Sequence, residues 1–202
     1  MIRIAQVLAL ALLTGCTHVR VPRVGEPPPV SDDEAKETVW QETVGKYSDR
    51  AQIYDGLDTR LFVAGTWQAP FFVDSRVTRM AEFRSIPASE IPALLDAERA
   101  RIGESNELFL GIHVNDPRND DFDKYNTIWR ISLKACGKDY ASNQIVRVGR
   151  ASLNLRSIYP YLDTFWVAYR VRFPKLTDCA EDKVLVQIAS ALGHAGLQFP
   201  TR

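Results

Sequence analysis

The stretch FWVAYRVRF, residues 165–173, constrains the fold more than any other part of the chain. In an extended chain it places Phe165, Val167, Tyr169, Val171 and Phe173 on one face, and Arg170 and Arg172 on the other. Successive side chains of a β-strand point to opposite faces of the sheet. The alternation therefore predicts a strand with one buried face, and requires a second layer to cover that face.

The same alternation predicts strands at residues 59–67, 107–114 and 128–135. Gly65 lies inside the first of these, where a glycine often marks a bulge. Further strands are expected at 144–148 and 183–189. Residues 196–199 are expected to return from the turn GHAG, residues 193–196, as a hairpin partner.

The apolar spacing changes to a helical period between residues 69 and 102. Residues 69–83 and 89–102 predict two helices, the second with Ser89 as its N-cap. A shorter helix is expected within 152–162, where Pro160 limits its length.

Most predicted strands follow one another through short turns, which favours antiparallel pairing. A parallel sheet would need a crossover helix between most strands, and only the stretch near residues 70–105 is long enough. The sequence thus predicts a mainly β fold, an antiparallel β-sandwich that is immunoglobulin-like in the loose sense, with a two-helix insertion near residues 70–105. Residues 34–202 are long enough for one core and are expected to form a single domain.

The chain begins with an apolar run from Ile4 to Leu13 that follows the single charge of Arg3. This run is too short for a membrane-spanning helix, which needs about 20 apolar residues. A basic start followed by a short apolar region is the pattern of a secretory signal peptide, here residues 1–15. The alternative interpretation is an N-terminal core helix that buries Cys16.

The run ends in Leu13-Thr14-Gly15-Cys16, which resembles the lipobox of bacterial lipoproteins at all four positions. The resemblance implies cleavage before Cys16 and a lipid on its thiol, so that the protein is anchored to a membrane without spanning it. Thr17 follows the cysteine, where the family's sorting rule implies the outer membrane, with the domain facing the periplasm or the cell surface. The body of the chain resembles only uncharacterised bacterial lipoproteins.

Residues 16–33 are predicted to be a tether between lipid and domain, because prolines favour an extended, semi-rigid chain. The prolines of this segment are Pro22, Pro27, Pro28 and Pro29. The chain carries 25 basic and 25 acidic residues, and this balance offers no electrostatic basis for binding nucleic acid.

Cys136 and Cys179 remain once Cys16 is acylated, and both lie in polar stretches at the ends of predicted strands. Pairs of cysteines form bridges in oxidising compartments, so we expect a Cys136–Cys179 disulfide. Two unpaired thiols are the alternative, because the distance between the two Cα atoms does not follow from the sequence.

Residues 115–126 are the most acidic stretch of the chain. Oxygen-rich side chains suit Ca²⁺, although the spacing departs from that of an EF-hand. The candidate ligands are Asp116, Asp120, Asp121 and Asp123. A solvated loop of turn-forming residues explains the same composition. His113 lies beside this loop and could serve as a base, although a histidine on the outer face of a strand is the commoner arrangement.

Aromatic and arginine side chains gather near the strand at 165–173, and such side chains are typical of binding surfaces. The candidate patch consists of Tyr159, Tyr161, Trp166, Arg170 and Arg172. The alternative is a second core layer, in which the predicted helices cover this face.

No catalytic signature is found in the sequence, and no cofactor is implied by it. The expected function is that of a non-enzymatic binding or scaffolding module for a protein partner in the cell envelope. An envelope hydrolase or a calcium-binding module that uses residues 115–126 is the alternative.

Overall fold

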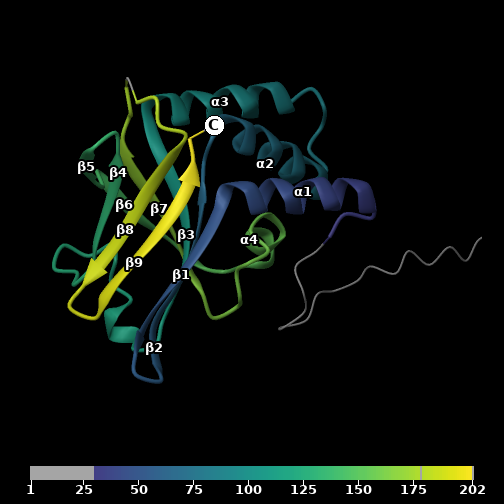
Figure 1. Ribbon diagram of the computed structural model, residues 1–202. Helices are drawn as coiled ribbons and strands as arrows, with labels where there is room; N and C mark the ends of the chain where they lie inside the picture. The colour runs from purple at the N-terminus through teal and green to yellow at the C-terminus, as the bar shows by residue number, and fades with distance from the viewer. Residues whose placement is uncertain (1–29, 178, 202) are drawn as a thin grey trace, which may run out of the picture.

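The computed structural model describes residues 30–177 and 179–201, and it is mainly β (Figure 1). The predicted signal peptide, Cys16 and residues 16–29 of the predicted tether lie outside the described residues. The helices are α1 (Glu34–Tyr47), α2 (Pro70–Phe83), α3 (Ile91–Glu104) and α4 (Leu153–Ile158), with a 3-10 turn η1 (Pro117–Asn119). The strands are β1 (Ser48–Asp55), β2 (Asp58–Trp67), β3 (Ser105–Val114), β4 (Arg130–Ala135), β5 (Lys138–Ala141), β6 (Gln144–Arg150), β7 (Val167–Pro174), β8 (Lys183–Ser190) and β9 (Gly193–Pro200).

The strands form two antiparallel sheets, which confirms the predicted sandwich. One sheet has five strands in the order β1-β2-β3-β7-β6, and the other has four in the order β5-β4-β8-β9. The edges of the two sheets meet where the Gln198 N–H donates to the Asp49 carboxylate at 2.8 Å.

One part of the core lies between the sheets and consists largely of the alternating side chains that the sequence pattern indicated, and a second part lies under the helices. Val171 and Phe173 of β7 belong to this core together with Val186 and Leu197 of the other sheet, and all four are inaccessible to solvent. Trp67 stacks between Phe173 and Phe199, with ring centroids 6.5 Å and 6.1 Å away. Burial of this kind stabilises the fold by about 25 cal/mol for each Å² of apolar surface removed from water.

Tyr159, the residue after α4, packs against the outer face of the five-stranded sheet at Phe109, and α2 packs on Tyr159 through Phe72. In Figure 1, α1, α2 and α4 lie to the right of the strands, and α3 runs across their upper ends. The predicted two-helix insertion is confirmed, because α2 and α3 lie between β2 and β3, and α4 occupies the predicted short helix. Helix α1 was not predicted. Its N-cap Asp33 accepts from two backbone N–H groups, and its side chain Trp40 packs on Phe72 of α2 at 5.6 Å.

Four local predictions are wrong. Helix α3 begins after Glu90, and Ser89 does not cap it. Gly65 pairs in regular register with β1, and the irregularity in that ladder lies at Ile53 and Tyr54.

The other two wrong predictions concern strand ends. The turn before β9 is formed by residues 191–192, so His194 lies in the strand. Strand β7 begins at Val167, and Phe165 precedes it with 74% of its surface exposed.

No helix in residues 30–177 and 179–201 is long and apolar enough to cross a membrane. Close to the first described residue, the Ser31 N–H donates a hydrogen bond of 3.1 Å to the Glu37 carboxylate of α1.

Candidate binding site

Tyr159 belongs to the core, so its assignment to an exposed patch is wrong. It follows α4, is 5% exposed, and its ring stacks on Phe109 with centroids 3.7 Å apart. Phe72 of α2 packs on its other side at 6.2 Å. Burial raises the pKa of the Tyr159 hydroxyl, which keeps it neutral. The second core layer weighed from the sequence describes this residue correctly.

Tyr161 and Trp166 are half-buried on the same face of the five-stranded sheet. The Tyr161 hydroxyl and the Thr66 hydroxyl share a hydrogen bond of 2.8 Å, and burial raises the pKa of Tyr161 well above its usual value. Gly111 of β3 makes room for this loop, because a Cβ there would lie 2.1 Å from Leu162 and 3.0 Å from Trp166. These aromatic side chains therefore serve mainly to seal the loop onto the sheet.

Arg170 and Arg172 are partly exposed and point to a buried carboxylate. Glu107 of β3 is only 3% exposed, and its oxygens lie 3.1 Å from Arg170 and 3.4 Å from Arg172. Arg101 of α3 also pairs with Glu107. A buried carboxylate is costly unless it is paired, and three guanidinium groups here supply that pairing.

A second carboxylate extends this network onto the helices. Glu98 of α3 pairs with Arg76 of α2 at 2.6 Å and with Arg101 at 2.5 Å. Burial alone would raise the pKa of Glu98, but hydrogen bonding to Arg101 and the charge of Arg76 outweigh it and hold the pKa below its usual value. We call this network the arginine cluster, and its members are Arg76, Arg101, Arg170, Arg172, Glu98 and Glu107. The cluster has more positive than negative charges.

A hollow of about 270 Å³ opens beside the arginine cluster, and we call it the arginine hollow. Arg76, Arg84 and Arg170 line it together with the single carboxylate of Glu98. The stacked rings of Phe109 and Tyr159 also line it. The remaining lining residues are mostly apolar and are Met80, Phe83, Val148, Asn154, Leu155, Ser157 and Ile158.

Sequence reasoning found Tyr159 and Arg170 of this hollow and missed Arg76, Arg84 and Glu98. The i,i+3 spacing of Glu98 and Arg101 on a predicted helix was the available signal for part of the cluster. Glu107 was missed because Arg170 and Arg172 reach it only when β3 lies next to β7. The alternation of apolar residues predicts strands but does not predict their order in the sheet.

The acidic stretch is held by protein contacts. The Asp120 carboxylate accepts from Arg147 and from the Tyr169 hydroxyl, each at 2.6 Å. Burial and the hydrogen bond to Asp120 raise the pKa of Tyr169 far above its usual value, so the hydroxyl remains a donor. Asp116 pairs with the exposed Arg118 at 2.6 Å.

The other two aspartates point to different partners. Asp121 accepts from the Thr127 hydroxyl at 2.8 Å, and Asp123 lies 4.0 Å from Lys124. His113 faces the Phe62 ring across the neighbouring strand. Among the described residues these side chains form no group of three close enough to hold a metal ion together, and the geometry does not assemble the calcium site or the hydrolase centre that were the alternatives.

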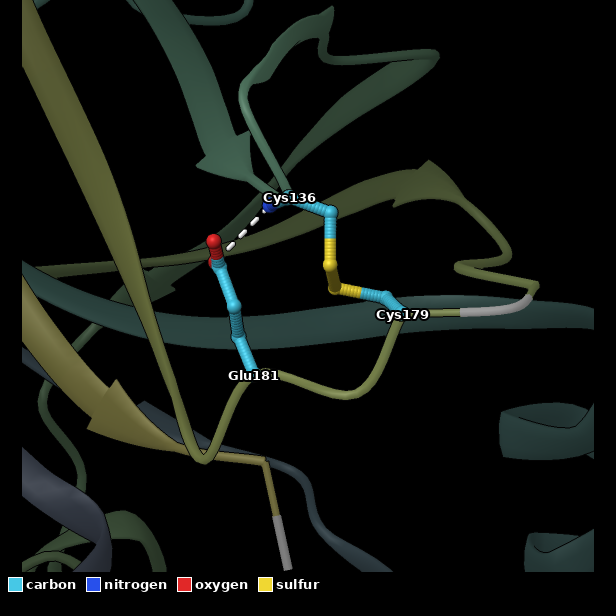
Figure 2. A group of neighbouring side chains, drawn as sticks. All are labelled: Cys136, Cys179 and Glu181. Atoms are coloured by element: carbon cyan, nitrogen blue, oxygen red, sulfur yellow. Dashed lines mark hydrogen bonds between the residues drawn. A yellow bond between two sulfur atoms is a disulfide. The ribbon is translucent and has the colours of Figure 1, made fainter.

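The one close group of potential metal ligands in the described part of the chain is Cys136, Cys179 and Glu181. Figure 2 shows that the two sulfur atoms are joined to each other, with the Cys136 N–H donating to Glu181 at 2.7 Å. The predicted disulfide is confirmed, with Cα atoms 5.7 Å apart, and both sulfurs are consumed by it.

No protein-family model, no curated protein and no solved structure matches this chain.

Proposed function

We propose that this chain is a lipid-anchored lipoprotein of the bacterial cell envelope whose sandwich domain acts as a non-enzymatic binding module. Cys16 carries the lipid, residues 16–33 space the domain from the membrane, and the domain binds a component of the envelope. Thr17, the residue after the lipidated cysteine, favours the outer membrane, with the domain facing the periplasm or the cell surface.

The disulfide supports an envelope location. Disulfides persist in oxidising compartments and are rare where thiols are kept reduced. The Cys136–Cys179 bridge joins two connections 43 positions apart in the sequence. It agrees with the export signal that the lipobox resemblance implies.

The arginine hollow is the observation that carries the binding role. Three guanidinium groups line it against one carboxylate, and that carboxylate is already shared by Arg76 and Arg101. Ligand sites are typically concave and lined mainly by apolar side chains with a few polar or charged groups, and the arginine hollow has this form.

The anchor is tested by Cys16→Ser, which removes the thiol that carries the lipid. We expect the variant to leave the membrane fraction after a high-salt wash, while wild type and a Thr17→Ser control remain. Mass spectrometry of the wild-type N-terminal peptide should show the added lipid. A Cys16→Ser protein that sediments like wild type, together with a wild-type peptide of unmodified mass, would refute the proposal.

A further inference from the structure

The arginines of the arginine hollow differ in how many of their guanidinium nitrogens are already paired with a carboxylate. Arg76 gives one terminal nitrogen to Glu98 at 2.6 Å, while its buried Nε has no hydrogen-bond partner in the described residues. Arg170 approaches Glu107 through its Nε at 3.1 Å. Within residues 30–177 and 179–201, its two terminal nitrogens and the whole Arg84 guanidinium make no ion pair. The arginine hollow therefore contains guanidinium nitrogens that can still donate hydrogen bonds to a ligand.

An anionic head group meets this excess of donors. Guanidinium groups bind carboxylate and phosphate through paired hydrogen bonds, and apolar surroundings strengthen the attraction. Glu98 occupies one terminal nitrogen of Arg76 and pairs with Arg101, and it leaves Arg84 and the terminal nitrogens of Arg170 to an incoming anion.

The apolar side chains that line the arginine hollow favour a ligand that also has an apolar part. Met80 and Phe83 come from α2, Leu155 from α4 and Val148 from β6. Phe83 and Val148 remain 36% and 43% exposed, so apolar surface is available there. A volume of about 270 Å³ equals about nine water molecules at about 30 Å³ each, enough for a head group and a short chain.

We infer that the arginine hollow binds an anionic amphiphile, with a phosphate or carboxylate head at Arg76, Arg84 and Arg170. The short apolar chain lies against Met80, Phe83 and Val148. This inference rests on the proposed binding function and names the chemistry of its ligand. A lipid head group and a free small anion share the charged part, and they differ in the chain.

The test uses calorimetric titration of the purified wild-type chain, held in phosphatidylcholine nanodiscs if it carries lipid and in buffer if it does not, with the same nanodiscs or buffer without protein as the blank. The probes are hexyl phosphate, hexanoate, inorganic phosphate and 1-hexanol. We expect one hexyl phosphate or hexanoate to bind per chain, at least tenfold more tightly than inorganic phosphate or 1-hexanol. Equal binding of inorganic phosphate would refute the amphiphile, and equal binding of 1-hexanol would refute the anionic head.

Three variants locate the site. Arg84→Gln removes an exposed cation without an ion pair, and Arg170→Gln leaves Glu107 with Arg101 and Arg172. Each should weaken hexyl phosphate binding about tenfold, because each removes one donor pair. Arg118→Gln is the matched control, since Arg118 is 89% exposed and pairs with Asp116 in another loop. We expect no change in binding for this control.

The ligand inference and the lipid anchor can be refuted independently of each other. Absence of hexyl phosphate and hexanoate binding overturns this inference even when Cys16 carries its lipid. An equal loss in Arg118→Gln and Arg84→Gln would also overturn it, because the attraction would then belong to the net charge of the chain. Tight binding by a chain that lacks lipid supports this inference and refutes the anchor alone.

Discussion

Asp120 shows how one residue fixes the most acidic segment of the chain. It joins the loop after β3 to Arg147 on β6 and to the fully buried Tyr169 on β7, each through a bond of 2.6 Å. The loop is further anchored by Phe122, which stacks on Trp129 at 4.8 Å. Hydrogen bonds to charged groups contribute about 1.5–3 kcal/mol each to stability, more than those between neutral groups.

We expect Asp120→Ala to lower the free energy of unfolding by about 2–3 kcal/mol, because Tyr169 and Arg147 lose a shared acceptor. Asp116→Ala is the control and should cost about 1 kcal/mol or less, since its partner Arg118 is almost fully exposed. Chemical denaturation measures both. Millimolar calcium should leave the wild-type midpoint unchanged. A midpoint that rises with calcium in wild type and not in Asp120→Ala would restore the calcium site.

The sequence could show that aspartates are frequent in this loop but not where they point. The partners of Asp120 lie 27 and 49 positions away, and only the packed sheet brings them to the loop. Composition alone left an ion site and a solvated loop as alternatives, while the folded chain supplies Arg147 as the partner of Asp120.

At the scale of the elements, β2, β3, β4 and β7 were expected from alternation, because a buried face gives a period of two. Strands β6, β8 and β9 were also expected, although no residue of β6 is buried, and β1 was missed. Helix α1 was missed because only four of its side chains are buried, at Trp40, Thr43, Val44 and Tyr47, in an otherwise polar segment. Strand β5 is four residues long and largely exposed, and it lies at a sheet edge, where no alternation is imposed.

The packing of the loop at residues 159–166 onto β3 depends on the missing side chain of Gly111. A Cβ there would lie 2.1 Å from Leu162, which is 3% exposed and has no open space to move into. We expect Gly111→Ala to lower the free energy of unfolding by about 1–3 kcal/mol, the usual cost of overpacking.

Gly45→Ala is the matched control for Gly111→Ala. It adds the same methyl group within α1, where nothing lies within 4 Å. Alanine favours a helix over glycine by about 1 kcal/mol, so this variant should be neutral or stabilising. Equal thermal midpoints for the two variants would contradict the close approach at Gly111.

On the scale of the whole molecule, the disulfide ties the turn between β4 and β5 to the connection between β7 and β8. Cys136 and Gly137 form a two-residue turn in which both have positive φ, at 49° and 70°, as a type I′ hairpin requires. β7 belongs to the five-stranded sheet and β8 to the four-stranded sheet, so the bridge fastens the chain where it passes between the layers. The bridge could be predicted from the sequence, because both cysteines lie in polar stretches at the ends of predicted strands.

Cys136→Ser with Cys179→Ser should therefore lower the unfolding midpoint in oxidising buffer. A bridge that closes a loop of 43 positions stabilises by up to about 4 kcal/mol in the chain-entropy model, because it limits the unfolded ensemble. Each single variant should lose about as much as the double variant, since either one removes the whole bond. Excess reductant should bring wild type to the same midpoint. Alkylation of denatured protein that was isolated without reductant should label neither cysteine, and stoichiometric labelling of both would show that the bridge does not form.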